Sequence, residues 1–198
     1  IAKNIIIAAL FYPLYSIVNA LVLGHDDTPE PLAGLGLGSL TVGILGLSIA
    51  ASFTDAVGTF ISQSFGQGDL RLCAVYRNRM IFLCTILFII IYIPTFFIES
   101  IYKKLGQEPQ VAEYGAQYVH IVFPFVYCFM ISHTYSVFGT FQRITHYGRN
   151  SMIVGFLAHV LLIGLFCFYF NWGFTGVCWA TALHFVVRLL MNVGQVVL

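Results

Sequence analysis

Charged residues are scarce in this chain of 198 residues. Asp, Glu, Lys and Arg together make up 9% of the sequence, against about 25% in a typical globular domain. A soluble domain of this length needs charged side chains to cover its surface, so long uncharged segments indicate a lipid environment instead. The net charge of +1 and the lack of charge runs also exclude the basic patches of nucleic-acid-binding proteins and the composition typical of disorder.

Cysteine is present, but it lacks the spacings that bind metals or form disulfide frameworks. None of the five cysteines belongs to a CxxC pair, and four lie in apolar runs, so we expect no cofactor and no metal site. No group of carboxylates, histidines and a nucleophile recurs at catalytic spacing, and the sequence therefore does not predict an enzyme. The first residue is Ile instead of Met and no signal-peptide n-region precedes the first apolar run, which indicates a part of a longer protein.

Apolar residues dominate what remains, at 59% of the sequence. A membrane-spanning helix needs about 20 mostly apolar residues, and runs such as residues 86–93 lack the alternation of a membrane β-strand. The uncharged stretch 150–187 is too long for one ordinary span and divides at residues 171–173. The sequence therefore predicts an all-α, polytopic membrane protein. Its six transmembrane helices cover about residues 4–23, 34–64, 78–99, 112–142, 150–170 and 174–197.

Basic residues are unevenly distributed between the two sides of these spans. With the N-terminus inside, the first outer loop (residues 25–31) contains no Lys or Arg. Because cytoplasmic segments carry the excess of Lys and Arg, the sequence predicts a cytoplasmic N-terminus. The inner segments and the last span hold Lys3, Arg71, Arg77, Arg79, Arg143, Arg149 and Arg188, whereas the outer loops hold Lys103 and Lys104.

Several short motifs follow one another along the predicted spans. They are Gly24-His25, Leu32–Gly38 (LAGLGLG), Ala56–Asp69 (AVGTFISQSFGQGD), Leu105–Ala112 (LGQEPQVA), Gly115–Tyr118 (GAQY), Phe123-Pro124 and Asn171–Val177 (NWGFTGV). In this order and at these intervals, they resemble the amino-terminal lobe of the multidrug and toxic compound extrusion (MATE) family. Within that family, the eukaryotic branch is the more similar one. The resemblance covers essentially the whole chain.

The resemblance implies a transporter made of two six-helix lobes related by a pseudo-two-fold axis. Such proteins exchange protons or sodium for organic, often cationic, substrates by alternating access. This chain would supply one lobe, so its expected partners are an organic cation, a proton or sodium ion, membrane lipid, and a second lobe or larger membrane complex. Two alternatives stay open: a non-transporting membrane subunit or scaffold derived from a transporter lobe, and a lipid-linked flippase of a related superfamily.

Asp55 is a carboxylate that lies well inside a predicted span, away from its ends. Because an unpaired charge in a bilayer is costly, such a residue faces a cavity or a partner, and we expect Asp55 to handle a proton or cation. The alternative is a structural carboxylate that is ion-paired or near the inner interface. Relatives in the family commonly carry an Asp at the position of Gly58, one helical turn later. Arg188 is a candidate partner for Asp55, although an arginine that snorkels to the inner headgroups is the simpler interpretation.

Asn19 and His159 are the other two candidates for substrate or ion binding. Asn19 falls where many bacterial relatives carry an Asp; an amide cannot release a proton, but it can hydrogen-bond a substrate. His159 lies where plant-like relatives have His, and histidine titrates near neutrality. The alternative for both side chains is a hydrogen bond between helices.

Gln63 and Gln142 end the second and fourth predicted helices. Both match glutamines of the family at the inner face. We expect them to act at an inner gate or, alternatively, simply to cap a helix end.

Overall fold

The computed structural model describes residues 2–25 and 28–197, and helices form nearly all of this part of the chain. The helical elements are α1 (Ala2–Leu23), α2 (Glu30–Thr41), η1 (Val42–Ser48), α3 (Ile49–Gly66), α4 (Leu70–Tyr92), η2 (Ile93–Phe97), α5 (Ile98–Lys104), α6 (Pro109–Phe141), α7 (His146–Ile163), η3 (Gly164–Tyr169) and α8 (Gly173–Val197).

In the described residues, these elements join into six helices that are long and apolar enough to cross a membrane. This confirms the predicted all-α, polytopic fold. The third span begins at Leu70, eight residues before the predicted start, because the Asp69 side chain caps the helix by accepting a 2.8 Å hydrogen bond from the Leu72 amide. The second span begins at Glu30 instead of residue 34, with Pro31 in its first turn, where proline costs no helical hydrogen bond.

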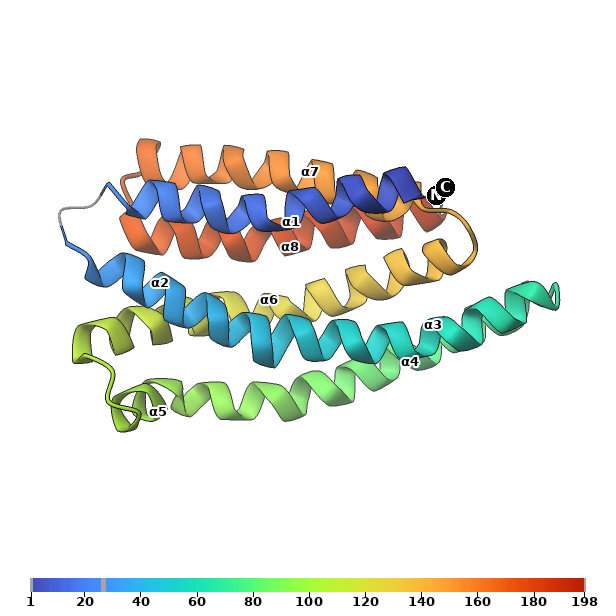
Figure 1. Cartoon of the computed structure of the whole chain (residues 1–198), viewed down its shortest axis with the longest axis horizontal. Coiled ribbons are helices and arrows are strands. Elements are labelled where there is room, and N and C mark those ends of the chain that lie inside the picture. Colours follow the sequence, from blue (N-terminus) through green and yellow to red (C-terminus); the bar gives the residue numbers. More distant parts are fainter. Residues whose placement is uncertain (1, 26–27, 198) are drawn as a thin grey trace.

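The helices form two groups that meet along α6 and α8 (Figure 1). One group contains α1, α7 and α8; the other contains α2, η1, α3, α4 and α5 around α6. α6 is the central element, because it packs against α8 as well as against the members of its own group. Accordingly, the side chains of Val119, Val122, Phe123, Val126 and Met130, all on α6, are completely buried.

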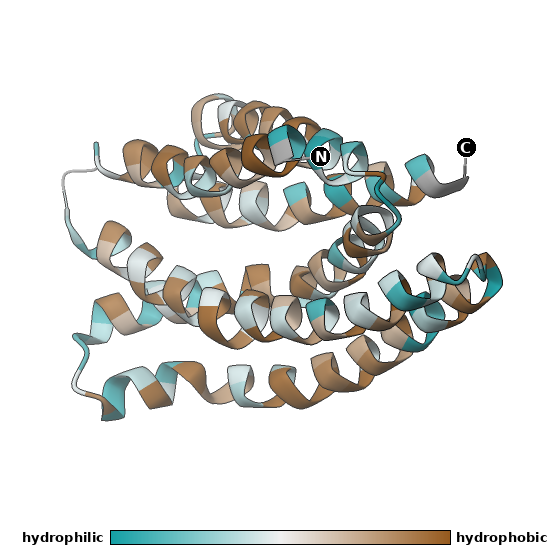
Figure 2. Cartoon of the chain, turned by 45° about the vertical axis from the view of Figure 1, so that its right-hand side comes forward, coloured by the Kyte–Doolittle hydropathy of each residue, from teal (hydrophilic) through white to brown (hydrophobic). Residues whose placement is uncertain are grey.

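Large apolar side chains cover the outside of the bundle. Leu10, Phe82, Leu161 and Phe168 are each more than 60% exposed. Figure 2 shows hydrophobic residues along the bodies of the helices and hydrophilic residues gathered at their ends. A perimeter of this kind favours contact with lipid, since exposed apolar surface on this scale is not found on soluble monomers.

Two glycines allow α2 to lie directly against α6. A Cβ atom on Gly34 would stand 2.3 Å from the Cβ of Tyr114, and one on Gly38 would stand 2.8 Å from the Cβ of Tyr118. These distances are shorter than any van der Waals contact, so a side chain at either position would force the helices apart. The GxxxG pair therefore provides the close helix approach typical of membrane proteins.

π-helical turns occur inside the second span and at the end of the fifth. η1 separates α2 from α3, and η3 follows α7. A π-helical turn carries an extra residue and shifts the face that the following helix presents, and such turns are frequent at functional sites. η1 meets this expectation, since Val42, Gly43 and Leu47 line the cavity described below.

Candidate functional site

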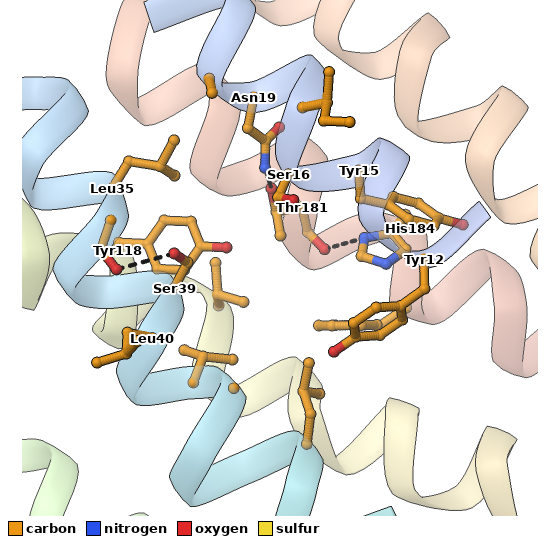
Figure 3. A pocket seen from close by; sticks show the side chains of 18 of the residues that line it. Tyr12, Tyr15, Ser16, Asn19, Leu35, Ser39, Leu40, Tyr118, Thr181 and His184 are labelled. Carbon is orange, nitrogen blue, oxygen red and sulfur yellow. Dashed lines mark hydrogen bonds between the residues drawn. The ribbon is translucent and has the colours of Figure 1, made fainter. Parts of the chain in front are cut away.

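A cavity of about 550 Å³ lies between the two helix groups, with α1 on one side and α2 and η1 on the other. Its lining is mainly apolar and aromatic, with a few polar groups from α1 and α8. Figure 3 shows Asn19, Thr181 and His184 near one another on one side, while Leu35, Ser39 and Tyr118 lie on the opposite side. Sites for small organic molecules have this size and composition.

Asn19 stands at the centre of a buried chain of hydrogen bonds. Its Nδ2 donates to Oγ1 of Thr181 at 3.0 Å, which leaves its Oδ1 to accept from Nε2 of His159, also at 3.0 Å. Thr181 Oγ1 in turn donates to the Val177 carbonyl at 2.8 Å. The bonds therefore run in one direction, and they assign the Nε2–H tautomer to His159. Three spans are joined by this chain, since Asn19 lies on α1, His159 on α7 and Thr181 on α8.

His184 and Tyr15 complete this polar cluster. His184 is 4% exposed and lines the cavity, and its Nδ1 lies against the carbonyl of Thr181. The Tyr15 ring packs on the rings of both histidines, at centroid distances of 4.5 Å from His184 and 5.2 Å from His159. Two imidazoles, a phenol and an amide thus form one buried cluster, in which Tyr15, Asn19 and His184 line the cavity.

The structure brings two of the three predicted binding residues together and places the third apart. Asn19 lines the cavity, whereas His159 is fully buried behind Asn19 and reaches the cavity only through it. Asp55 lies on an exposed face of α3 and does not line the cavity. Asn19 and His159 are therefore brought together, as hydrogen-bond partners between helices, and Asp55 stands apart from them.

Asp55 lies one helical turn beyond the lining of a second, smaller hollow of about 220 Å³. Ser48 and Ala51 line this hollow, and Asp55 follows Ala51 by four residues on the same face of the helix. The neighbouring Thr54 is hydrogen-bonded to Nδ1 of His133 at 2.6 Å, and the Asp55 carboxylate lies near enough to interact electrostatically with the His133 ring. Asp55 thus lies close to the hollow without lining it.

Both expectations for Arg188 are wrong. Among the described residues, the ion pair is the one between Lys103 and Glu99, so Arg188 does not pair with Asp55. Arg188 is 4% exposed, so its side chain does not snorkel to the headgroups either. It lines the cavity and the smaller hollow together, because the packing of α8 against α6 and α7 turns this residue inward.

The two predicted gate residues lie at the ends of their helices. Nε2 of Gln142 donates to the Phe138 carbonyl of its own helix at 3.2 Å, and Gln142 directly follows the last residue of α6. Gln63 is exposed in the last turn of α3, where its carbonyl accepts the Gln67 amide at 3.1 Å. These contacts favour a role at helix ends, and a gate function stays a prediction.

Sequence reasoning missed Thr181 and His184 as cavity residues. Their spacing contained a usable signal. Polar residues recur on α8 at intervals of three, four and four residues, which places them on one face of an apolar span. All four are buried: Thr181, His184, Arg188 and Asn192.

We expect the Asn19→Ala variant to be less stable than the wild-type protein by about 2 kcal/mol, because His159 and Thr181 both lose a buried hydrogen bond. The measurement is the denaturation midpoint in sodium dodecyl sulfate, followed by tryptophan fluorescence. Ser16→Ala is the control: Ser16 lines the same cavity, but its hydroxyl bonds the Pro13 carbonyl within α1. Equal midpoints for the two variants would contradict a stabilising role of the Asn19 bonds.

The chain resembles known transporters in sequence and in fold. The model of the MatE family matches residues 5–165. Multidrug and toxin extrusion protein 2 of Mus musculus is 28% identical over 204 residues, which cover 96% of this chain and 33% of that protein. Protein DETOXIFICATION 1 of Arabidopsis thaliana is 24% identical over 172 residues, which cover 87% of this chain and 36% of that protein.

Solved structures agree on the fold. The crystal structure of the eukaryotic MATE transporter AtDTX14 superimposes with a TM-score of 0.94 at 16% identity, covering 100% of this chain and 44% of that one. The chain thus spans about a third of the length of these two curated relatives and less than half of that transporter. The match to the family model over most of the sequence shows that this chain belongs to the MATE family of multidrug and toxin extrusion transporters, as its amino-terminal six-helix lobe.

Proposed function

We propose that this chain forms the amino-terminal lobe of an antiporter that exports organic solutes in exchange for protons or sodium ions. The observation that carries the proposal is the cavity between α1 and α2. It lies within the membrane-spanning part of the bundle, it is large enough for a small organic molecule, and polar groups from two spans converge on its apolar lining. The relatives found favour neither the scaffold nor the flippase alternative.

The lobe also contains an irregular helical turn at the cavity and two helix groups that could move relative to each other. The cavity wall includes the π-helical turn η1, in the middle of the second span. α1 packs mainly against α7, whereas α2 packs mainly against α6, so the two walls of the cavity belong to different helix groups. A relative movement of these groups would open or close the cavity without breaking the packing inside either group.

The coupling ion would be handled by different groups in this lobe than in bacterial relatives. Asn19 carries an amide, which neither releases a proton nor carries a charge. Asp55 and His159 remain as titratable candidates. The hydrogen bond from His159 to Asn19 would connect the protonation state of the histidine to the cavity wall. We propose Asp55 as the coupling residue and the pair Asn19–His159 as the link to the substrate.

Reconstitution of the intact protein into lipid vesicles tests this function. An imposed proton gradient or sodium gradient should drive the movement of an organic solute across the membrane, and dissipation of that gradient with an ionophore should stop it. The gradient that works identifies the coupling ion. Failure of both gradients to drive any of a panel of organic cations and anions would contradict the proposal.

The proposed orientation places the start of α1 and the α3–α4 turn in the cytoplasm. Part of the predicted outer loop, residues 26–27, lies outside the described residues, so the exposed neighbour Thr28 is the better probe. In a variant whose five native cysteines are replaced, we expect an impermeant thiol reagent to label Thr28→Cys in intact cells and to leave Arg71→Cys unlabelled. Arg71→Cys should react once the cells are opened. Labelling in the reverse pattern would overturn the orientation.

A further inference from the structure

Arg188 is a buried cation that forms no ion pair within the part of the chain that the structure describes. Its side chain is 4% exposed, and its Nε has no hydrogen-bond partner within residues 2–25 and 28–197. No carboxylate of these residues forms an ion pair with it. Arginine is almost never buried in a membrane protein unless it pairs with another group or lines a pathway.

The surroundings of Arg188 hold its stem in place and, among the described residues, provide no ion pair for its charge. A Cβ atom on Gly155 of α7 would stand 2.5 Å from Cγ of Arg188 and 2.9 Å from its Cδ, so the stem lies directly against the glycine backbone. The guanidinium lies over the Phe129 ring at 5.6 Å, and the phenols of Tyr12 and Tyr15 lie nearby. The imidazoles of His133 and His184 also lie near it, and Asp55, the carboxylate beside the smaller hollow, forms no ion pair with it.

Arg188 also stands where the two hollows meet. It lines both the 550 Å³ cavity and the 220 Å³ hollow, together with Tyr12 and Leu47. A solute that enters either space therefore meets the side chain of Arg188. The planar fork of N–H donors on that group matches a carboxylate or another oxyanion, which can accept two parallel hydrogen bonds.

We propose that Arg188 is the anion-binding residue of this cavity and that it takes the carboxylate, or a similar oxyanion, of an organic solute. The apolar and aromatic lining then holds the body of the solute. This inference rests on the proposed function and changes its substrate from the cation implied by the resemblance to a solute with an anionic group. Cation–π contacts with the cavity tyrosines would not offset the repulsion of a cationic solute by a buried charge in the same cavity.

The test uses two probes with the intact protein: para-aminohippurate, an aromatic carboxylate, and tetraethylammonium, a cation. We expect the wild-type protein to bind para-aminohippurate and to prefer it to tetraethylammonium. Loss of charge-assisted hydrogen bonds predicts about a 10- to 100-fold weaker affinity for the carboxylate in Arg188→Met. Arg188→Lys keeps the charge but loses the fork, and its affinity should lie between the two.

A second variant keeps the positive charge of Arg188 and shifts the position of its guanidinium. Gly155→Ala places a methyl group against the stem of Arg188 and should weaken para-aminohippurate binding by about tenfold, since the fork is displaced from its position. Gly164→Ala is the matched control on the same span, because a Cβ there would meet no atom within 4 Å; its affinity should equal that of the wild type. This pair decides the question even where Arg188→Met fails to fold.

Three results would overturn the inference: unchanged carboxylate affinity in Arg188→Met, equal affinity in Gly155→Ala and Gly164→Ala, or a wild-type protein that binds tetraethylammonium and not para-aminohippurate. If an acidic residue elsewhere in the intact protein held Arg188, Arg188→Met would lower the thermal midpoint without changing carboxylate binding, which is the first of these results. Binding of para-aminohippurate without gradient-driven movement would contradict the proposed antiport while supporting the anion site.

Discussion

The Asp55→Asn variant is expected to lose gradient-driven transport down to the background of empty vesicles, while its expression and stability stay normal. The amide of asparagine has nearly the shape of the carboxylate, but it can neither carry a proton nor attract a cation by charge. Asp55 is exposed in this lobe, and within the described residues its carboxylate takes part in no ion pair. The substitution therefore removes chemistry without removing a structural contact.

The position of Asp55 explains why one carboxylate should have such an effect. It follows Ser48 and Ala51 on the face of the second span that borders the smaller hollow, and it acts electrostatically on His133. A proton or cation at Asp55 would thus change the field at the hollow that also contains Arg188. The coupling ion and the solute could influence each other across this space by charge alone.

Two further variants separate charge from position. Asp55→Glu keeps the carboxylate and should retain measurable transport, whereas Asp55→Asn should retain none. Glu113→Gln is the matched control, because Glu113 is also an exposed carboxylate in a predicted span, near the start of α6. Its transport should remain close to that of the wild type. Unchanged transport in Asp55→Asn would remove Asp55 from the coupling mechanism.

The membrane fold could be predicted from the sequence because its signal lies along the chain. Apolar length decides whether a segment spans the bilayer, and that quantity needs no knowledge of neighbouring helices. The break at residues 171–173 was also visible, since Asn171, Trp172 and Gly173 interrupt an uncharged stretch. The ends of helices were less predictable. The third span starts at Leu70, earlier than predicted, because the Asp69 side chain caps the helix with a single hydrogen bond.

The candidate site was harder to predict because it depends on how each helix is rotated. Arg188 was a candidate partner for Asp55 because both are charged residues inside spans, but the direction in which a side chain points is set by packing around the helix axis. The bond between Asn19 and His159 joins positions 140 residues apart, so each residue was recognisable as polar in an apolar span and the pair was not. The π-helical turn η1 was not predicted either, because no local sequence motif indicates such a turn.

Gly34→Ala is expected to destabilise the protein by about 3 kcal/mol, although alanine is the better helix former. The added methyl group would stand 2.3 Å from the Cβ of Tyr114 and 3.1 Å from the Gly115 amide nitrogen. Backbone and Cβ atoms cannot move aside as the end of a flexible side chain can, so α2 and α6 must separate. The separation would also widen the cavity on its α2 side, where Leu35 and Ser39 lie.

Gly36→Ala is the matched control for this prediction, because it makes the same chemical change two residues away on the same helix. A Cβ on Gly36 would meet no atom within 4 Å, so the substitution should leave stability unchanged or raise it by up to about 1 kcal/mol through helix propensity. The measurement is the difference in denaturation midpoint between the two variants in sodium dodecyl sulfate. Equal midpoints would mean that α2 and α6 do not meet at Gly34, and the fold of the lobe would then have to differ at its centre.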